Sequence, residues 1–248
     1  MFDAVNLPVN EITTEILRNY LADYKNNSNA GMVTIDNMRR TLSSFFAWLE
    51  NEDHIVKSPV RRIHKVKTTR RVKEKLTDEN LEKLRDTCSN VRDLAILELL
   101  ISTGMRVGKI TRLNISDMNF QERSCIVLGK GNSEREVYFS AKSKMYIEKY
   151  LKTRIDNNEA LFVSLIKPYN RLGISGIEIA IRNLGKQANI NKVHPHKFRR
   201  TMATMAIDKG MPIEQVQKLL GHIKIDTTME YAMVNQNNVK NSHRKYIT

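Results

Sequence analysis

The sequence predicts a mainly helical protein with one small antiparallel β-hairpin, an α+β fold in two parts joined by a basic linker. Apolar residues recur at helical spacing over most of the 248 residues. Only residues 124–129 ("SCIVLG") and 135–140 ("REVYFS") have strand character, and the "KGNSE" between them suits a tight turn. Residues 59–75 are rich in Lys and Arg and lack helical spacing, which indicates an extended linker.

The part before the linker, residues 1–58, carries two helical patterns. Residues 13–26 place apolar side chains on one helical face. Residues 34–52 do the same, and Thr34 or Asp36 can cap the start of that helix. Two helices rarely form an independent domain, so we expect the first part to be incomplete or to be stabilised by a partner.

The part after the linker, residues 76–248, begins with a helix capped by Thr77 or Asp78. The next segment, "VRDLAILELLIST" (91–103), is apolar on nearly all sides, which is typical of a helix at the centre of a core. Gly104 ends it, and "RVGKITRLN" predicts a short helix before the hairpin.

Helices resume after the hairpin, and two of them carry clear end signals. Pro195 suits a first helical turn, and Gly210 and Gly221 suit helix ends. Asp226 or Thr227 can cap a further helix in "DTTMEYA", which a polar C-terminal tail follows. The expected helices cover residues 141–156, 175–188, 194–210 and 212–220.

Charge points to a polyanionic partner. The chain has 41 Lys and Arg against 27 Asp and Glu, a formal net charge of +14. Such an excess favours nucleic acid, because neutralising phosphates releases their counterions; solubility alone is the plainer alternative. The Lys and Arg residues cluster in the linker, which favours a segment that lies along a DNA backbone over a basic segment that only contacts solvent. The cations that we expect to meet phosphates are Arg39, Arg40, Arg61, Arg62, Lys65, Lys67, Arg70 and Arg71.

Other classes are disfavoured. No apolar run approaches the ~18 to 20 residues of a membrane span, and the N-terminus does not read as a secretory signal. Cys88 and Cys125 are far apart and read as reduced thiols of a cytoplasmic protein.

Four segments hold candidate reactive residues, each weak alone. They are "STGMRVGKI" with Arg106, "VLGKGNSEREV" with Lys130, "HPHKFRR" with His196 and Arg199, and "LLGHIKIDTTMEYA" with His222 and Tyr231. Singly, each residue reads as a surface, turn or capping side chain. A metal site from His194, His196 and His222 is conceivable, but no carboxylate or cysteine ligand accompanies them.

Together, and in this order, the four segments resemble the tyrosine recombinase (phage integrase) family. That family has an Arg in "TGxR", a Lys on a β-hairpin in "GKG", an "HxxR" pair, and "LGH" followed nine residues later by a nucleophilic Tyr. The match covers residues 77–235. It implies a helical core-binding (SAM-like) domain, here apparently partial, plus a tyrosine-recombinase catalytic domain.

The resemblance also implies chemistry and partners. Tyr231 attacks a DNA phosphate to form a 3′-phosphotyrosyl link, and Arg106 and Arg199 bind the phosphate oxygens. Lys130 protonates the leaving 5′-oxygen, His196 assists proton transfer at Tyr231, and His222 donates to the phosphate. No metal or other cofactor is expected. The expected partner is double-stranded DNA at specific sites, bound by a synaptic tetramer.

One residue departs from the family pattern. The family has an acidic residue three positions after the first Arg, and this chain has Lys109 there. A positive charge at that position is expected to weaken the site, so Lys109→Glu is expected to raise activity. Two alternatives therefore stay open: a catalytically impaired, recombinase-like DNA-binding protein, and a type IB topoisomerase-like relaxing enzyme.

Overall fold

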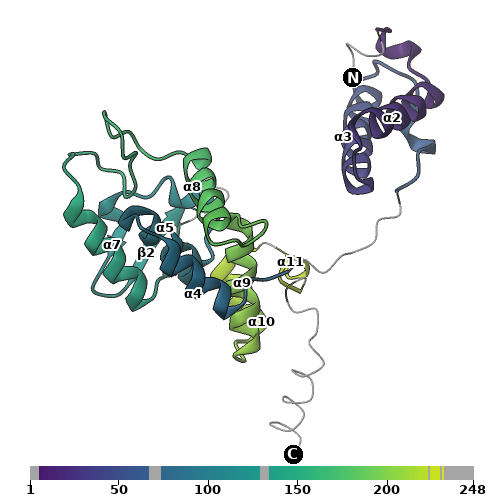
Figure 1. The fold of residues 1–248 in the computed structure, drawn as a ribbon. Coiled ribbons are helices and arrows are strands. Elements are labelled where there is room, and N and C mark those ends of the chain that lie inside the picture. The colour runs from purple at the N-terminus through teal and green to yellow at the C-terminus, as the bar shows by residue number, and fades with distance from the viewer. Residues whose placement is uncertain (1–5, 67–73, 129–133, 223, 230, 232–248) are drawn as a thin grey trace, which may run out of the picture. The chain divides into compact units, whose positions relative to one another are not determined.

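The chain forms two compact units, Met1–Val72 and Lys73–Thr248 (Figure 1). The structure is a computed structural model, and it describes residues 6–66, 74–128, 134–222, 224–229 and 231. Each unit has its own hydrophobic core, so each is described by itself.

The first unit is built on two helices, α2 (Thr14–Ser28) and α3 (Met32–Asn51), preceded by the short 3-10 helix η1 (Val9–Glu11). Thr13 caps α2, because its side chain accepts a hydrogen bond from the backbone N–H of Ile16. The buried apolar residues of this unit form one cluster: Ile12, Leu17, Leu21, Ile35, Leu42, Phe46, Leu49 and Val60.

The start of α3 differs from the expectation. Neither Thr34 nor Asp36 caps the helix, since it begins at Met32 with Gly31 at the N-cap position. Asp36 lies one turn inside α3 and is buried, because two arginines of the following turn neutralise it.

The beginning of the expected linker belongs to the first unit. Residues Pro59–Arg62 form a 3-10 helix, η2, that contacts both α2 and α3. Thr14 Oγ1 donates to the carbonyl oxygen of Pro59 at 2.6 Å, and Val60 is 3% exposed. A buried apolar residue anchors this stretch, which charge alone does not reveal. Residues 67–73 lie outside the described part of the chain.

The second unit is arranged around α5 (Val91–Thr103), as its all-round apolar pattern predicts. Residues Ala95–Leu97, Leu99 and Leu100 are inaccessible to solvent. In Figure 1, α5 lies between α7 (Ala141–Thr153) and α9 (Pro195–Asp208), and it contacts both helices. The cap residues are Asn90, whose side chain accepts from the first turn, and Gly104, with φ +57°.

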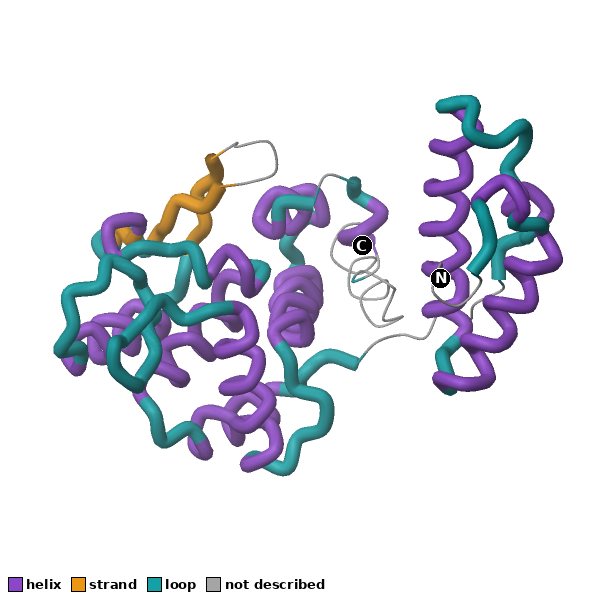
Figure 2. Tube along the Cα trace, turned by 90° about the horizontal axis from the view of Figure 1, so that it is seen from above, coloured by secondary structure: helices purple, strands orange, loops and turns teal. Residues whose placement is uncertain are grey.

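A small three-stranded antiparallel sheet lies at one edge of this unit (Figure 2). Its order is β1 (Met118–Asn119), β2 (Ser124–Leu128) and β3 (Glu134–Tyr138), with Cys125 paired to Val137. The two longer strands are those expected from the sequence. The two-residue β1 is an addition, because so short a strand carries no alternating pattern. The hairpin turn lies outside the described residues.

The remaining helices follow the expected order. Thr77 caps α4, Pro195 is the first residue of α9, and Gly221 ends α10 with φ +64°. The expected cap Gly210 follows the actual C-cap, Lys209, with φ +90°. The helices not yet bounded are α4 (Asp78–Thr87), α6 (Val107–Ile110), α8 (Ile174–Gln187), α10 (Ile213–Leu220), α11 (Asp226–Met229) and the 3-10 helix η3 (Ile115–Asp117).

These elements confirm the predicted fold class, mainly α with a small antiparallel sheet. Among the described residues, no helix is long and apolar enough to cross a membrane.

Candidate active site

Arg199 is the most buried of the predicted site residues, with 2% of its surface exposed. Its Nη1 donates to the carbonyl oxygen of Gly104 at 2.7 Å, and its Nη2 donates to that of Leu220 at 2.8 Å. Both acceptors are at helix ends, where carbonyl groups have no partner within the helix. The guanidinium of α9 is therefore held between the end of α5 and the end of α10.

Arg106 lies next to this guanidinium. It is the N-cap residue of α6, two residues after Gly104, and its side chain is exposed. Burial and then the positive charge of Arg106 lower the pKa of Arg199 to about 10. Arg199 stays protonated at neutral pH, and the two guanidiniums are near enough for one charge to affect the other.

His222 follows the Gly221 cap and is 7% exposed. Its Nδ1 and the Thr228 hydroxyl share a hydrogen bond of 2.8 Å. Burial and then the charges of nearby arginines, Arg199 first, lower the pKa of His222 to about 4. The imidazole is consequently neutral at pH 7 and keeps one N–H to donate.

Tyr231 packs beside His222, with ring centroids 5.9 Å apart and planes tilted by 32°. Its backbone N–H donates to the carbonyl oxygen of Thr228 at 2.9 Å. The charge of the Tyr231 side chain and a hydrogen bond with it raise the pKa of Arg199, against the effect of burial. The tyrosine hydroxyl is thus within hydrogen-bonding reach of the buried guanidinium.

The other predicted catalytic residues are placed less fully. His196 lies in the first turn of α9, exposed, one turn before Arg199 on the same side of the helix. Lys130 lies outside the described residues. The structure therefore brings together Arg106, Arg199, His222 and Tyr231, with His196 one turn away.

Sequence reasoning missed a third arginine. Arg135 of β3 reaches the last turn of α10, where Nη1 lies 3.3 Å from the carbonyl oxygen of Leu219. Burial and then the charge of Arg106 lower the pKa of Arg135, and Arg135 in turn contributes to lowering that of His222. The available signal was strand alternation: Arg135 is on the same face as the buried Val137, an unusual place for a charge.

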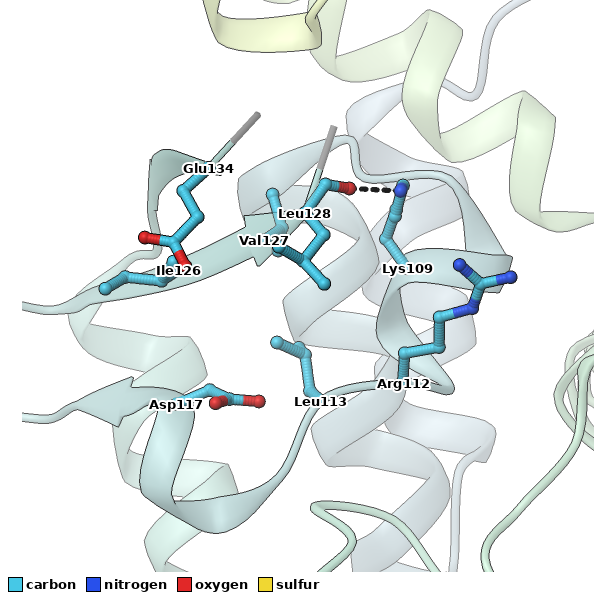
Figure 3. Close-up of a pocket in the computed structure, with 8 residues that line it drawn as sticks. All are labelled: Lys109, Arg112, Leu113, Asp117, Ile126, Val127, Leu128 and Glu134. Carbon is cyan, nitrogen blue, oxygen red and sulfur yellow. Dashed lines mark hydrogen bonds between the residues drawn. The ribbon is translucent and has the colours of Figure 1, made fainter. Parts of the chain in front are cut away.

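Lys109 reaches the hairpin. Its Nζ donates to the carbonyl oxygen of Leu128, the last described residue of β2 (Figure 3). This contact closes one side of a small cavity of about 190 Å³ between α6 and the sheet. Two acidic residues, Asp117 and Glu134, also line the cavity. Lys109 therefore tethers the strand that leads to Lys130.

The predicted phosphate contacts of the first unit differ in availability. Arg39 pairs with Asp36 at 3.0 Å, and its side chain is 16% exposed. Arg40 pairs with the same carboxylate at 2.9 Å but is 60% exposed. These partners, the hydrogen bond from Arg39 first, lower the pKa of Asp36.

The predicted contacts of the basic segment are mostly at the surface. Arg61 pairs with Glu50 at 2.7 Å and is 60% exposed. Arg62 and Lys65 are exposed. The further predicted contacts Lys67, Arg70 and Arg71 lie outside the described residues.

Metal ligands do not gather in the described part of the chain, where no three His, Cys, Asp or Glu side chains could hold an ion together. The side chains that come together at this site are mainly cationic. Two guanidiniums, a neutral imidazole and a tyrosine hydroxyl suit an anion with several oxygens, because an arginine fork donates two parallel hydrogen bonds.

The sequence and the fold are similar to those of known proteins. The pattern of the "Phage integrase family" matches residues 74–238. The chain is 32% identical over 217 residues to "Tyrosine recombinase XerC" of Oceanobacillus iheyensis, covering 83% of this chain and 71% of that protein. It is 30% identical over 246 residues to the protein of the same name from Staphylococcus aureus (strain USA300), covering 95% and 81%.

Solved structures of similar fold include XerA recombinase, at 27% identity and a TM-score of 0.64, covering 99% of this chain and 87% of the other. A Tn1549 transposon integrase in complex with circular intermediate DNA has 19% identity and a TM-score of 0.77, covering 95% and 86%.

Proposed function

The chain belongs to the phage integrase family, the tyrosine recombinases, and from that premise we propose that it cleaves and rejoins DNA strands through a covalent 3′-phosphotyrosyl link at Tyr231. Membership makes it a DNA breaking and rejoining enzyme of the site-specific recombinase type. The catalytic role of each individual residue is proposed below.

One observation carries the assignment: the guanidinium of Arg199, fixed by the carbonyl groups of Gly104 and Leu220, lies beside the Tyr231 side chain. Two of its donors are occupied by these carbonyl groups, and its side chain also interacts with that of Tyr231. A phosphate bound there meets the nucleophile and fixed cations together.

The proposed cleavage step balances without a cofactor. The Tyr231 oxygen bonds to phosphorus as its proton passes toward His196, and the bond from phosphorus to the 5′-oxygen breaks. Lys130 supplies the proton that the leaving 5′-oxygen needs. The link conserves the phosphodiester energy, so a 5′-hydroxyl can reverse the step on the same or another strand.

The cations act on the charge that develops at phosphorus. Arg106 and Arg199 bind the non-bridging oxygens, and the neutral His222 donates one further hydrogen bond. A preorganised donor of this kind is typically worth about 3 to 4 kcal/mol in the transition state. Fixed guanidiniums thereby supply the electrophile that metal ions supply in other phosphoryl-transfer enzymes.

The proposed partner is double-stranded DNA at specific sites, bound by four copies that hold two duplexes during strand exchange. The net charge of +14 and the exposed cations Arg40, Arg62 and Lys65 support DNA binding. The two free cysteines agree with a cytoplasmic location.

A catalytically impaired DNA-binding protein is the second candidate, and Lys109 favours it. The family's acid is replaced by an ammonium that is bonded to the Leu128 carbonyl group. Under this alternative the protein binds and occupies a recombination site without cutting it.

Covalent trapping tests the proposal. Cells expressing the protein are lysed in denaturant, the protein is captured, and the DNA attached to it is sequenced. We expect one or a few sequences to be enriched with the wild-type protein and lost with Tyr231→Phe. Adducts that persist in Tyr231→Phe would place the nucleophile elsewhere.

Two further measurements separate the alternatives. Salt-sensitive binding of the recovered sequence without adducts supports the impaired binding protein. Strand exchange between two copies of that sequence supports a recombinase, and relaxation of supercoils without exchange supports a topoisomerase-like enzyme.

A further inference from the structure

Arg135 is a charged residue on the side of β3 that faces the core, where charged side chains are unusual. It lies on the inward face of β3, two residues before the fully buried Val137, and is only partly exposed. Its neighbours include Arg106, whose charge lowers the pKa of Arg135 after burial does. A third cation beside two others is unfavourable unless something nearby compensates it.

The compensation comes from the C-terminal end of α10. Nη1 of Arg135 lies 3.4 Å from the carbonyl oxygen of Lys218 and 3.3 Å from that of Leu219, both in the last turn. The Lys218 carbonyl also accepts a hydrogen bond from the backbone N–H of Gly221 at 3.0 Å, and the helix end carries a partial negative charge that favours a cation. Arg135 thus caps α10 from the neighbouring sheet.

Gly221 is shaped by the same contact. A Cβ at residue 221 would lie 1.9 Å from Nη1 of Arg135 and 2.6 Å from its Cζ. The φ of +64° already favours glycine there. The guanidinium therefore rests against the backbone that turns from α10 to His222.

The backbone of Arg135 belongs to β3, which begins at the hairpin turn. Arg135 pairs with Val127, and the next pair toward the tip is Leu128 with Glu134. Lys130 lies in the chain between these two strands, two residues after Leu128. Arg135 therefore connects β3, one pair before the last described pair of the hairpin, to the end of α10 that precedes His222.

We propose that Arg135 is a positioning residue for cleavage, which sets the Lys130 hairpin against the turn between α10 and His222. The inference rests on the proposed role of Lys130 as the acid that protonates the 5′-oxygen. In this proposal Arg135 does not touch the reacting atoms, because its Nη1 donates to the carbonyl groups of Lys218 and Leu219. Its removal should misplace the acid while leaving the phosphate-binding arginines in place.

The leaving group provides a readout that a purely structural role does not move. When sulfur replaces the bridging 5′-oxygen of the scissile phosphate, the thiolate departs without a proton. A thiol has a pKa near 8.5, against about 15.7 for water, so it leaves readily as the anion. A variant impaired only in acid delivery recovers on the sulfur substrate, and one impaired in phosphate binding does not.

The experiment compares single-turnover cleavage of two suicide duplexes with the trapped sequence, one with oxygen and one with sulfur at the bridge. Arg135→Met removes the guanidinium and keeps an apolar stem. Glu136→Gln, on the outer face of the same strand, is the matched control. Lys130→Ala and Arg199→Lys define the two extremes.

We expect Arg135→Met to slow the oxygen substrate by roughly 10- to 100-fold, within the range of lost acid catalysis, and the sulfur substrate by less than about threefold. Each comparison is made within one variant, so a partly unfolded preparation lowers both rates equally and leaves their ratio unchanged. Equal slowing on both substrates, with Lys130→Ala rescued by sulfur, overturns the inference about Arg135 alone. No rescue of Lys130→Ala overturns the acid role of Lys130 first, and this inference with it.

Discussion

Arg199 donates from Nη1 to the carbonyl oxygen of Gly104 at 2.7 Å, and this bond joins the two predicted phosphate-binding arginines through the backbone. Gly104 is the left-handed cap of α5, and Arg106 follows it by two residues. The hydrogen bond therefore fixes one guanidinium and at the same time fixes the turn that presents the other. Burial of Arg199 makes this arrangement rigid, because its donors would otherwise lack partners.

Arg199→Lys should abolish most cleavage. A lysine keeps the charge, but it cannot donate to Gly104, Leu220 and a phosphate in fixed directions. We expect single-turnover cleavage of a suicide substrate to fall by about 10²- to 10³-fold. The control is Arg200→Lys, because Arg200 is less buried and donates to the backbone carbonyl of Glu74. Similar losses in both variants would contradict a special role for Arg199.

The pair of Arg85 and Glu98 should matter for stability alone. Glu98 is 2% exposed inside α5, and its Oε1 accepts from Nε of Arg85 at 2.5 Å. Arg85→Met leaves a buried carboxylate without its partner, which costs about 3 to 5 kcal/mol of unfolding free energy. The double variant Arg85→Met/Glu98→Met should recover most of this loss in urea unfolding. A double variant as unstable as Arg85→Met would show that the charge is not the cause.

Stability should depend on pH through His222. Its pKa is about 4 in the folded protein against 6.5 ordinarily, because burial and then Arg199 disfavour the cation. The unfolded chain therefore binds a proton between pH 6.5 and 4 that the folded protein does not, so stability falls as pH falls through this window. Above pH 6.5 both states are neutral at this residue, and the full contribution is present.

His222→Gln isolates this effect, because glutamine does not titrate. We expect the difference in unfolding free energy between wild type and His222→Gln to shrink as pH falls from 6.5 to 4. The pKa of His194 is lowered too, by burial and then Arg200, but His194 is present in both proteins and cancels in the difference. A difference that does not change with pH would contradict the neutral state of His222.

The basic segment should contribute to the salt dependence of DNA binding. Arg62 and Lys65 are exposed, and removing one cation that touches a phosphate lowers the slope of log K against log salt by about 1. Arg62→Ala/Lys65→Ala is therefore expected to lower the slope by about 2 on specific and random DNA alike. Lys152→Ala, in the last turn of α7, is the control. An unchanged slope would remove this segment from the DNA-binding surface.

Local sequence patterns predicted the features that depend on residues close together in the chain, such as helices and their caps. The all-round apolar run of α5 and the caps at Thr77, Gly104 and Gly221 are such features, and the structure places each as expected. The pairing of Arg106 with Arg199 was expected from the order of the motifs, and the charge of Arg106 does lower the pKa of Arg199 after burial does.

Partners distant in sequence were not predictable in this way. Arg135 reaches Leu219 across 84 positions, and only the folded sheet brings them together. The burial of Asp36 with Arg39 and Arg40 was missed because a charged residue at a helix start reads as a cap. Lys109 was interpreted as a charge facing the arginines, whereas its ammonium is bonded to the hairpin.

The hydrogen bond from Lys109 to the Leu128 carbonyl group changes the effect expected of Lys109→Glu on cleavage. Two effects of opposite sign are expected when Lys109→Glu is made. The tether to the Leu128 carbonyl is removed, and one exposed hydrogen bond contributes about 1 kcal/mol. Against this, a carboxylate three residues after Arg106 stabilises nearby cations, and an opposite charge nearby typically shifts a pKa by about 1 unit or more.

We expect the electrostatic gain to exceed the cost of removing the tether, so that Lys109→Glu cleaves the suicide substrate about three- to tenfold faster than wild type. Lys109→Met separates the two effects, because it removes the tether without adding an acid, and it should cleave more slowly than wild type. If Lys109→Glu is no faster than wild type while Lys109→Met is slower, the tether outweighs the charge. Lys109 then stabilises the hairpin as an adaptation of this chain, and its interpretation as an impairing substitution is wrong.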